Sequence, residues 1–327
     1  MIKKDGTETS TIGETASLLL STFFPKADRS EKYEVIGPIK RYDRVIDTNR
    51  VKAAIWRIMP NKAPGIDGIS AGIIRIAWPV LGDEITELVD LVVLPKPGRI
   101  DLTNPKSFRP VSLLPTMAKA LETIIIKDLE NETSLNEFKE QHEFVQGRST
   151  ITAIKELYSW SMPSKARNIV GVFLDMTGAF DDMGWRPMLE RLAEMGASIR
   201  TMKIIQNYLS NREVQLIMSG ITKRGCPQGS QLGPTLWKVA MTAIGRIKLD
   251  ESAKIVIYAD DIALLKSAAR PHTAFSRIEK YLDELKKWAD KCQLQFSGPK
   301  TQMIAIKGGV KPNYTVSFGI QHNANRK

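Results

Sequence analysis

The chain contains few of the side chains that bind zinc or form disulfides. Its 327 residues include two cysteines, Cys226 and Cys292, and three histidines, His142, His272 and His322. A structural zinc site needs a close cluster of Cys and His ligands, and disulfide-rich secreted domains need several cysteine pairs. We therefore expect no Cys/His zinc cluster and an intracellular, reduced, non-secreted protein.

The chain also lacks a long apolar run. The nearest candidate is residues 18–24, which is too short to span a bilayer and has polar neighbours. No signal-peptide hydrophobic region lies near the start of the chain. Residues 11–24 instead predict a capped amphipathic helix that stops at Pro25, so we expect no membrane partner.

Acidic residues are fewer than basic ones. Lysine and arginine number 47 and acidic residues 36, so the net charge is 47 − 36 = +11. Such an excess suits a polyanionic partner, although a basic solvated surface is the alternative. With 43% hydrophobic residues, the chain can bury a large core in about two subdomains.

Two adjacent carboxylates interrupt an apolar run at residues 255–265. The run predicts a β-hairpin with its turn at Ala259, Asp260 and Asp261, because β-branched residues fill both arms and Asp tolerates turns. Neighbouring like charges repel, so the turn needs either water or a bound cation. Both alternatives remain open from these residues alone.

A second apolar run, residues 168–174, ends in Asp175. This run predicts a strand, and catalytic groups are commonly displayed at strand ends. Asp175 could cap a helix, or it could join Asp260 and Asp261 as hard oxygen ligands for Mg²⁺. Two such ions, about 3.5–4 Å apart, promote phosphoryl or nucleotidyl transfer.

Several motifs occur in an informative order. Phe-Leu-Asp-Met-Thr-Gly-Ala-Phe-Asp at 173–181, Gly-Cys-Pro-Gln-Gly-Ser-Gln-Leu-Gly-Pro-Thr-Leu-Trp at 225–237 and Tyr-Ala-Asp-Asp at 258–261 resemble the three palm motifs of reverse transcriptases. Upstream, Asn-Lys-Ala-Pro-Gly-Ile-Asp-Gly at 61–68, Ser-Phe-Arg-Pro-Val-Ser-Leu at 107–113 and Gln-Gly-Arg-Ser-Thr at 146–150 are similar to finger motifs of non-long-terminal-repeat (LINE-like) retrotransposons, including the insect type. The resemblance covers roughly residues 10–307.

This resemblance implies an α+β fold with a right-hand polymerase palm of the split βαβ, ferredoxin-like kind. It divides the chain into an N-terminal extension at 1–50, fingers at 51–160, a palm at 161–307 and a truncated tail at 308–327. The sequence ends before the family's primer-grip and thumb region, so we expect the thumb to be missing. A chain without that clamp should be a weak or inactive polymerase, because misplacing a primer end by about 1 Å can cost 10²-fold in rate.

The implied function is that of an RNA-directed DNA polymerase, which copies RNA into DNA by two-metal nucleotidyl transfer. Its cofactor would be Mg²⁺, as two ions, with Mn²⁺ as the alternative. Its partners would be an RNA template, a DNA primer and deoxynucleoside triphosphates, in the nucleus or the cytoplasm. The competing interpretation is a catalytically silent nucleic-acid-binding relic, and an unrelated Mg²⁺ phosphotransferase would leave Arg109 and Gln228 unexplained.

The resemblance also assigns roles to individual residues. Asp175, Asp260 and Asp261 would be catalytic metal ligands, and Lys300 would donate a proton to the pyrophosphate leaving group. Residues that would contact the nucleotide are Lys96, Arg109, Phe180, Gln228 and Gly229, and the residue that would contact the template is Arg148. The alternatives are a surface role for Arg148, a core role for Phe180 and a structural turn at 228–229.

Apolar spacing predicts the remaining elements. Helices are expected over 51–59, 117–129, 187–195, 199–209, 232–244 and 275–292, with another opening at Ser149 or Thr150. Strands are expected over 91–94 and 107–114 as partners, over 213–218 with a turn at 219–220, and over 293–296 and 303–306 as a closing pair. Residues 26–50 predict a loop. Residues 84–94 contain none of the turn residues that the family usually has there, so the connection at Asp90 and Leu91 is expected to be shortened.

Overall fold

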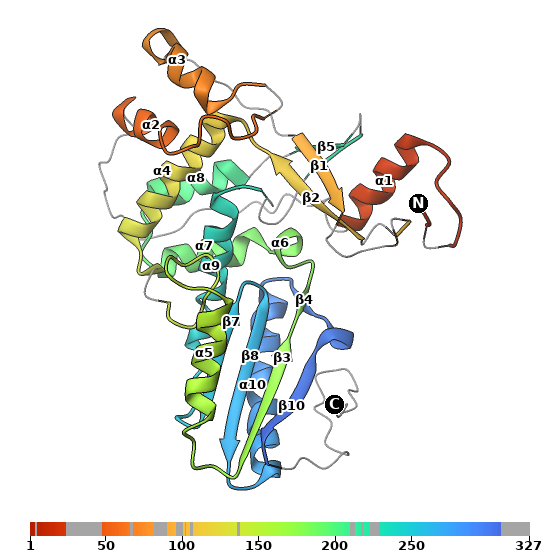
Figure 1. Ribbon diagram of the computed structural model, residues 1–327, viewed down its shortest axis with the longest axis vertical. Coiled ribbons are helices and arrows are strands. Elements are labelled where there is room, and N and C mark those ends of the chain that lie inside the picture. Colours follow the sequence, from red (N-terminus) through yellow and green to blue (C-terminus); the bar gives the residue numbers. More distant parts are fainter. Residues whose placement is uncertain are drawn as a thin grey trace. The chain divides into compact units, whose positions relative to one another are not determined.

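The computed structural model has an α+β fold. It describes residues 1–3, 5–23, 48–65, 68–81, 90–95, 101, 103–104, 107–135, 138–209, 213–216, 219–222 and 229–308. The chain forms two compact units whose segments interleave in the sequence (Figure 1). The first unit comprises Met1–Thr133 and Phe180–Trp237, and the second comprises Ser134–Ala179 and Lys238–Lys327.

The second unit is built on a four-stranded antiparallel sheet in the order β10-β3-β8-β7. The strands are β3 (Asn168–Leu174), β7 (Ala253–Tyr258), β8 (Asp261–Ala268) and β10 (Gln302–Lys307). Helices lie between β3 and β7, and helix α10 (Pro271–Lys291) lies between β8 and β10. The connectivity is therefore β-α-β-β-α-β, with the first strand in the middle of the sheet.

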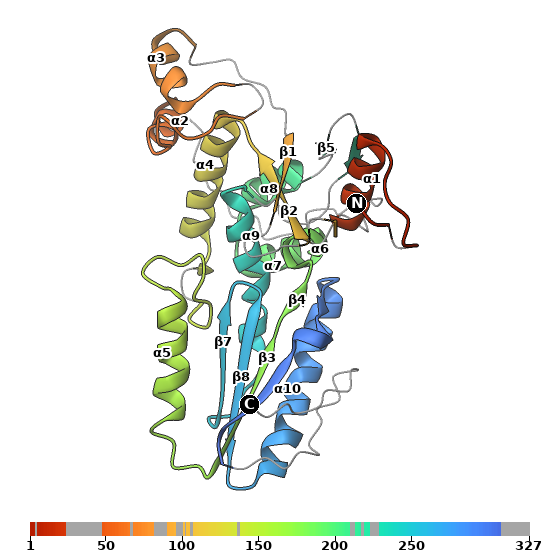
Figure 2. The same cartoon turned by 45° about the vertical axis from the view of Figure 1, so that its right-hand side comes forward.

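Two helices lie on different sides of this sheet (Figures 1 and 2). Helix α10 packs on β8 and β3 and buries Phe275, Ile278, Leu282 and Leu285, as the three-and-four spacing predicts. Helix α5 (Thr150–Ser161) packs beside β7. Consecutive residues of β3 and β8 are buried, so both faces of the sheet are largely covered along these strands.

The chain segment that follows α10 does not form the predicted closing strand pair, and this prediction was wrong. Strand β9 (Gln295–Phe296) pairs with β4 (Met176–Thr177), whereas β10 pairs with β3. A 3₁₀ turn at Gly298–Lys300 separates the two strands, and the Ser297 N–H at its start donates to the Asp175 carbonyl at 2.7 Å. This bond directs the chain onto a new partner strand instead of turning it back on itself.

The first unit contains a helical layer made by α2 (Thr48–Ile55), α3 (Ala71–Leu81), α4 (Thr116–Glu132), α7 (Trp185–Glu194) and α8 (Ile199–Leu209). The helix predicted over 51–59 ends earlier, at Ile55. Ile58 still reaches the core through a tighter turn, in which its N–H donates to the Ile55 carbonyl at 3.1 Å, whereas Met59 is 71% exposed. The apolar spacing therefore predicted the burial of Ile58 correctly and the burial of Met59 wrongly.

A second four-stranded sheet lies in this unit, in the order β2-β1-β5-β6. Strand β1 (Asp90–Pro95) pairs antiparallel with β2 (Phe108–Leu113), as predicted. Strands β5 (Glu213–Leu216) and β6 (Ser219–Thr222) form a hairpin, and β5 joins β1 in parallel. Ser219 and Gly220 were predicted to turn the chain, but they belong to β6, and residues 217–218 lie outside the described residues. The loop predicted over 26–50 was wrong at 48–50, which begin α2, and residues 26–47 lie outside the described residues.

The remaining helices are α1 (Ile12–Phe23), α6 (Ala179–Asp182) and α9 (Leu232–Met241), followed by a 3₁₀ turn at Ile244–Arg246. The helix predicted over 11–24 is confirmed by α1.

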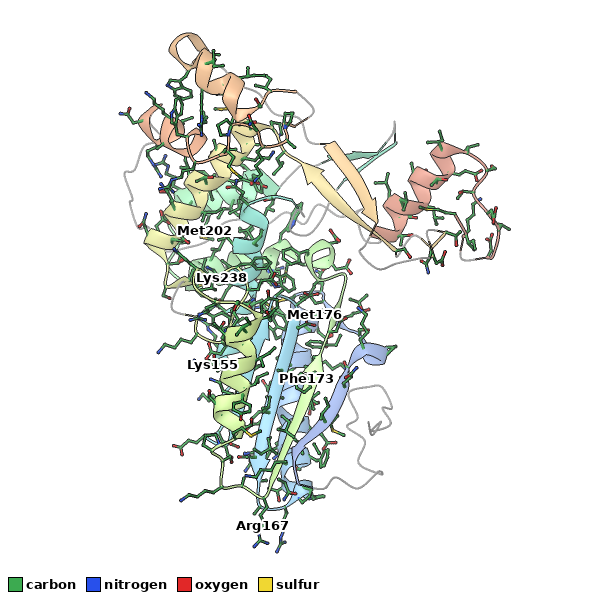
Figure 3. The ribbon with its side chains drawn as sticks, in the orientation of Figure 1. Lys155, Arg167, Phe173, Met176, Met202 and Lys238 are labelled. Atoms are coloured by element: carbon green, nitrogen blue, oxygen red, sulfur yellow. The ribbon has the colours of Figure 1, made fainter. Side chains whose placement is uncertain are left out.

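Met176 and Met202 are buried, whereas Lys155 and Arg167 are exposed and reach outward (Figure 3). Among the helices that the structure describes, none is long and apolar enough to cross a bilayer.

Candidate active site

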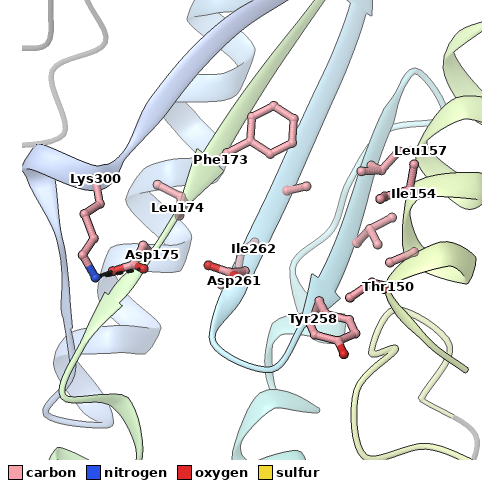
Figure 4. Close-up of a pocket in the computed structure, with 13 residues that line it drawn as sticks. Thr150, Ile154, Leu157, Phe173, Leu174, Asp175, Tyr258, Asp261, Ile262 and Lys300 are labelled. Atoms are coloured by element: carbon pink, nitrogen blue, oxygen red, sulfur yellow. Dashed lines mark hydrogen bonds and ion pairs between the residues drawn. The ribbon is translucent and has the colours of Figure 1, made fainter. Parts of the chain in front are cut away.

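Asp175 and Asp261 face each other across the sheet of the second unit. The β3–β8 ladder ends at the pair Leu174 and Ile262, so Asp175 follows one partner as Asp261 precedes the other. Directly opposed residues of antiparallel strands point to the same face, with Cβ atoms about 4.5–5.5 Å apart. Figure 4 shows both carboxylates at this end of the sheet. Two segments that are distant in the sequence therefore contribute one carboxylate each to a common site.

A pocket opens beside these carboxylates. Asp175, Asp261 and Lys300 line its polar end, and α5 contributes Ile154 and Leu157 to its apolar wall (Figure 4). Other residues that line it include Thr150, Ala153, Phe173, Val256, Tyr258 and Ala263. The site thus combines charged groups with an apolar wall, as is common in ligand pockets.

The hairpin turn lies at the predicted place but is shorter than predicted. Asp261 pairs with Tyr258 and begins β8, so only Ala259 and Asp260 lie in the turn. Ala259 has a φ of 53°, a left-handed conformation that non-glycine residues rarely adopt. The Gln141 side-chain amide, which is buried, donates to the Ala259 carbonyl at 3.4 Å. Surrounding structure must hold such a residue in place, and Gln141 is one group that does so.

The segment that carries Gln141 runs alongside β7. The His142 N–H donates to the Ile257 carbonyl, and the Ile257 N–H donates to the Glu140 carbonyl, both at 2.8 Å. The His142 ring contacts Glu156 of α5 at 2.8 Å. No period or motif in the sequence pointed to this support for the turn, because it depends on contacts between segments more than a hundred residues apart.

Burial and neighbouring negative charges raise the pKa of Asp260 and Asp261. Burial raises the pKa of Asp260, and the charges of Asp261 and Asp175 raise it further, while Lys300 opposes them. Burial and the Asp175 charge likewise raise the pKa of Asp261. Burial also raises the pKa of Glu143, a nearby carboxylate that sequence reasoning missed, and the charges of Asp260 and Asp261 add to this effect. A cation would relieve this repulsion.

Lys300 supplies one positive charge to the site. Its ammonium donates to the two carboxylate oxygens of Asp175, at 3.0 and 3.2 Å (Figure 4). The side chain is 63% exposed, and its backbone lies in the 3₁₀ turn that Ser297 ties to Asp175. Lys300 is therefore an electrostatic partner of Asp175 and reaches the pocket.

The carboxylate oxygens fit a hard divalent cation. Within the part of the chain that the structure describes, no three His, Cys, Asp or Glu side chains stand close enough together to hold a metal ion. Asp175 and Asp261 line the pocket, but Asp260 is not among its lining residues. Mg²⁺ is usually bound by one or two carboxylates together with water and substrate phosphates, so two facing aspartates are a suitable protein contribution.

Arg148 has partners within its own unit. Its Nη1 donates to the carbonyls of Phe138, Lys139 and Gln141, at 3.2, 2.7 and 2.6 Å. Ser149 then caps α5 in a reciprocal capping box, as predicted. Arg148 therefore ties down the loop before α5, and its contact with a template stays a prediction.

Phe180 and Gly229 lie in the first unit. Phe180, in α6, is half-buried and stacks on the Trp237 ring with centroids 5.0 Å apart and planes inclined by 21°. Gly229 is exposed and has a φ of 94°, which favours glycine. The nucleotide-contacting roles of both residues stay predictions.

The other predicted nucleotide contacts lie outside the described structure. Lys96 and Gln228 are not among the described residues. The Arg109 backbone lies in β2 opposite Leu94, but its side chain is not described. Their roles stay predictions.

Comparison with known proteins identifies the family. Residues 94–319 match the family model for reverse transcriptase (RNA-dependent DNA polymerase). The chain therefore belongs to the reverse transcriptase family. This confirms the resemblance carried by the motifs at 173–181, 225–237 and 258–261.

The relatives are proteins of insect mobile elements. The chain is 28% identical over 327 residues to a putative 115 kDa protein in type-1 retrotransposable element R1DM of Drosophila melanogaster, covering 94% of this chain and 31% of that protein. It is 24% identical over 309 residues to the RNA-directed DNA polymerase from mobile element jockey of Drosophila funebris, covering 83% and 33%. The chain thus spans about a third of the length of these relatives.

Among solved structures, the chain is similar to telomerase from Candida albicans in complex with the TWJ fragment of telomeric RNA. The TM-score is 0.49 at 11% identity, and the match covers 74% of this chain and 44% of that chain.

Proposed function

We propose that this chain is an RNA-directed DNA polymerase that extends a DNA primer on an RNA template. The observation that carries the proposal is the pair of facing carboxylates, Asp175 and Asp261, at one end of the β3–β8 ladder. In a member of the reverse transcriptase family, these residues occupy two motifs that resemble the catalytic ones. Their partner Lys300 and the adjoining pocket support the same interpretation.

The proposed chemistry divides among these groups. Asp175 and Asp261 would hold Mg²⁺, as two ions or with Mn²⁺ in its place, and Asp260 would add negative charge beside them. When bound, such ions activate the primer hydroxyl and stabilise the departing oxygen. Lys300 would neutralise Asp175 and give a proton to the pyrophosphate leaving group. The wall from α5 excludes water on one side.

The sheet β10-β3-β8-β7 would be the polymerase palm. Its β-α-β-β-α-β connectivity is that of the split βαβ motif. In this proposal the palm extends over 161–307 and the fingers over 51–160. The nucleotide contacts would be made by Phe180 and Gly229, together with Lys96, Arg109 and Gln228.

Primer extension on poly(rA)/oligo(dT) with Mg²⁺ and dTTP tests the proposal. The unchanged chain should extend the primer at least weakly, and Asp175→Asn should reduce extension to background, because one charged ligand is lost. Asp283→Asn is the matched control, since Asp283 is exposed on α10 within the same unit. The control should extend like the unchanged chain.

Two outcomes would contradict the proposal. If the unchanged chain binds the template-primer but does not extend it with either Mg²⁺ or Mn²⁺, the chain is a silent nucleic-acid-binding relic. If Asp175→Asn and Asp283→Asn extend equally well, the facing carboxylates do not form the active site.

A further inference from the structure

A buried carboxylate in the first unit has no part in the chemistry proposed above. Glu122 of α4 is 0% exposed. It accepts hydrogen bonds from the Tyr208 hydroxyl, from Ser230 Oγ at 2.7 Å and from the Gln231 N–H at 2.7 Å. Burying a carboxylate is costly unless its oxygens are satisfied, so these three donors account for its position.

Two of the three donors immediately precede α9. The Gly233 N–H donates to Ser230 Oγ at 2.9 Å, which caps the start of that helix. Thr123, the next residue of α4, donates to the Gln231 side-chain carbonyl at 2.9 Å. Glu122 and Thr123 of α4 therefore bind Ser230 and Gln231, which directly precede α9.

The anchored residues Ser230 and Gln231 belong to the motif at 225–237 and directly follow Gly229. Gly229, at a φ of 94°, is the residue before Ser230 and is exposed. It has no side chain that could hold it in place, so its position depends on how its neighbours are held. Glu122 fixes both residues that follow it.

The same helix contains a matched carboxylate with no link to a motif. Glu132 accepts hydrogen bonds from the Ser198 N–H at 2.8 Å, from Ser198 Oγ at 3.1 Å and from Thr201 Oγ1 at 2.9 Å. Ser198 precedes α8, so Glu132 anchors that helix as Glu122 anchors α9. Variants of Glu122 and Glu132 can therefore be compared to separate structural anchoring from a role in nucleotide binding.

We propose that Glu122 is a positioning residue for the incoming nucleotide. It acts through Ser230 and Gln231 to hold the backbone of Gly229 where the nucleotide must fit. The inference rests on the proposed polymerase function and deepens it, because it names a group that neither the motifs nor the pocket includes. Glu122 is buried and does not itself contact substrate.

Steady-state kinetics of Glu122→Gln and Glu132→Gln test this role, with dTTP varied on poly(rA)/oligo(dT). In Glu122→Gln the new NH₂ group cannot accept a hydrogen bond, so a donor at Ser230 or Gln231 loses its partner. We expect the KM for dTTP to rise at least about 10-fold, because small misplacements near reacting groups cost up to about 10²-fold. The KM for template-primer should stay within about twofold, since binding of the phosphate backbone does not depend on this segment.

Glu132→Gln should also lower the thermal midpoint, because it removes an acceptor from a carboxylate anchor. It should leave the KM for dTTP within about twofold, because Glu132 holds Ser198 and Thr201 and not the residues next to Gly229. Equal effects of both variants on the KM for dTTP would overturn the inference. If Glu122→Gln does not fold, Ser230→Ala replaces it, because this change removes one donor and keeps the carboxylate. An unchanged KM for dTTP in Ser230→Ala would also overturn the inference.

Failure of the proposed function gives a different result. In that case the unchanged chain does not extend the primer, and the inference falls with it. Failure of the inference alone leaves the unchanged chain active and Glu122→Gln indistinguishable from Glu132→Gln.

Discussion

Lys300 and Asp175 form an ion pair across 125 residues of sequence, with the ammonium 3.0 and 3.2 Å from the two carboxylate oxygens. The pair connects the end of β3 to the turn before β10. The Lys300 charge opposes the rise in the pKa of Asp260 and Asp261 that burial and the Asp175 charge cause. A lysine in this place can act as a charge partner, as a proton donor, or as both.

Replacing Lys300 separates these two roles. Lys300→Met should reduce the primer-extension rate by about 10²–10⁴-fold if the ammonium gives a proton to the leaving group. Lys300→Arg keeps the charge beside Asp175 but releases a proton poorly, so it should remain close to the Met variant. Lys287→Met, which changes an exposed lysine on α10, should leave the single-turnover rate unchanged. A wild-type rate in Lys300→Arg would show that charge pairing is sufficient.

The sequence was sufficient to predict the strands next to Asp175 and Asp261. Apolar runs that end in Asp175 and surround Asp261 predict strands, and both strands and the turn between Tyr258 and Asp261 are confirmed. Gln141 and Glu122 could not be predicted. Gln141 contacts Ala259, which lies 118 residues away in the sequence, and Glu122 contacts Ser230, which lies 108 residues away. No local pattern in the sequence encodes such contacts.

Prediction from the sequence was wrong where a segment could pair with either of two strands. The alternation at 293–296 and 303–306 suits strands, but it cannot say which strand each one joins. The bond from Ser297 to the Asp175 carbonyl decides this choice, and it is a tertiary contact. The end of α2 was also predicted too late in the sequence. Ile58 packs in the core although it lies beyond the helix, so its apolar side chain did not indicate helix.

The half-buried Phe180 tests sugar discrimination. Phe180→Ala should reduce the preference for dTTP over UTP, measured as the ratio of kcat/KM values, by at least about 10-fold if the ring excludes the 2′-hydroxyl. Phe180→Tyr keeps the aromatic stack on Trp237 and should keep the preference. If Phe180→Ala retains both its activity and the full preference, the ring serves only the core.

Gly65, in the motif at 61–68, has a packing role that a simple loop would not need. A Cβ atom at this position would lie 2.7 Å from the Pro115 nitrogen and 2.8 Å from its Cα, at the start of α4. Backbone cannot retreat as a flexible side chain can, so Gly65→Ala should lower the free energy of unfolding by about 1–3 kcal/mol. A Cβ atom at Gly13 of α1 would meet only Thr11 Oγ1, at an ordinary contact distance of 4.0 Å, so Gly13→Ala should instead raise the free energy of unfolding by up to about 1 kcal/mol. Equal urea midpoints for the two variants would refute this packing role.

Asp250 provides a stability test remote from the carboxylate pair. Its carboxylate accepts hydrogen bonds from Lys266 Nζ at 2.6 Å, from Ser252 Oγ at 2.7 Å and from the Tyr281 hydroxyl at 2.7 Å. Burial alone would raise the pKa of Asp250, but these donors outweigh it and hold the pKa well below its usual range. Lys266 is the more buried partner, with a side chain 5% exposed against 41% for Asp250.

Asp250→Asn should therefore lower the free energy of unfolding at pH 7 by about 1–2 kcal/mol, a value reduced for the solvent exposure of the carboxylate. The pKa of Asp250 is lower in the folded than in the unfolded chain, so its contribution is fully present above the unfolded value of about 3.9 and declines as the pH falls toward the folded value. Urea unfolding at pH 7 and pH 3 checks both points, with Asp283→Asn as the control on exposed helix. The difference in the free energy of unfolding between wild type and Asp250→Asn should be smaller at pH 3 than at pH 7. An equal difference at both pH values would mean that the lost stability does not come from the charged carboxylate.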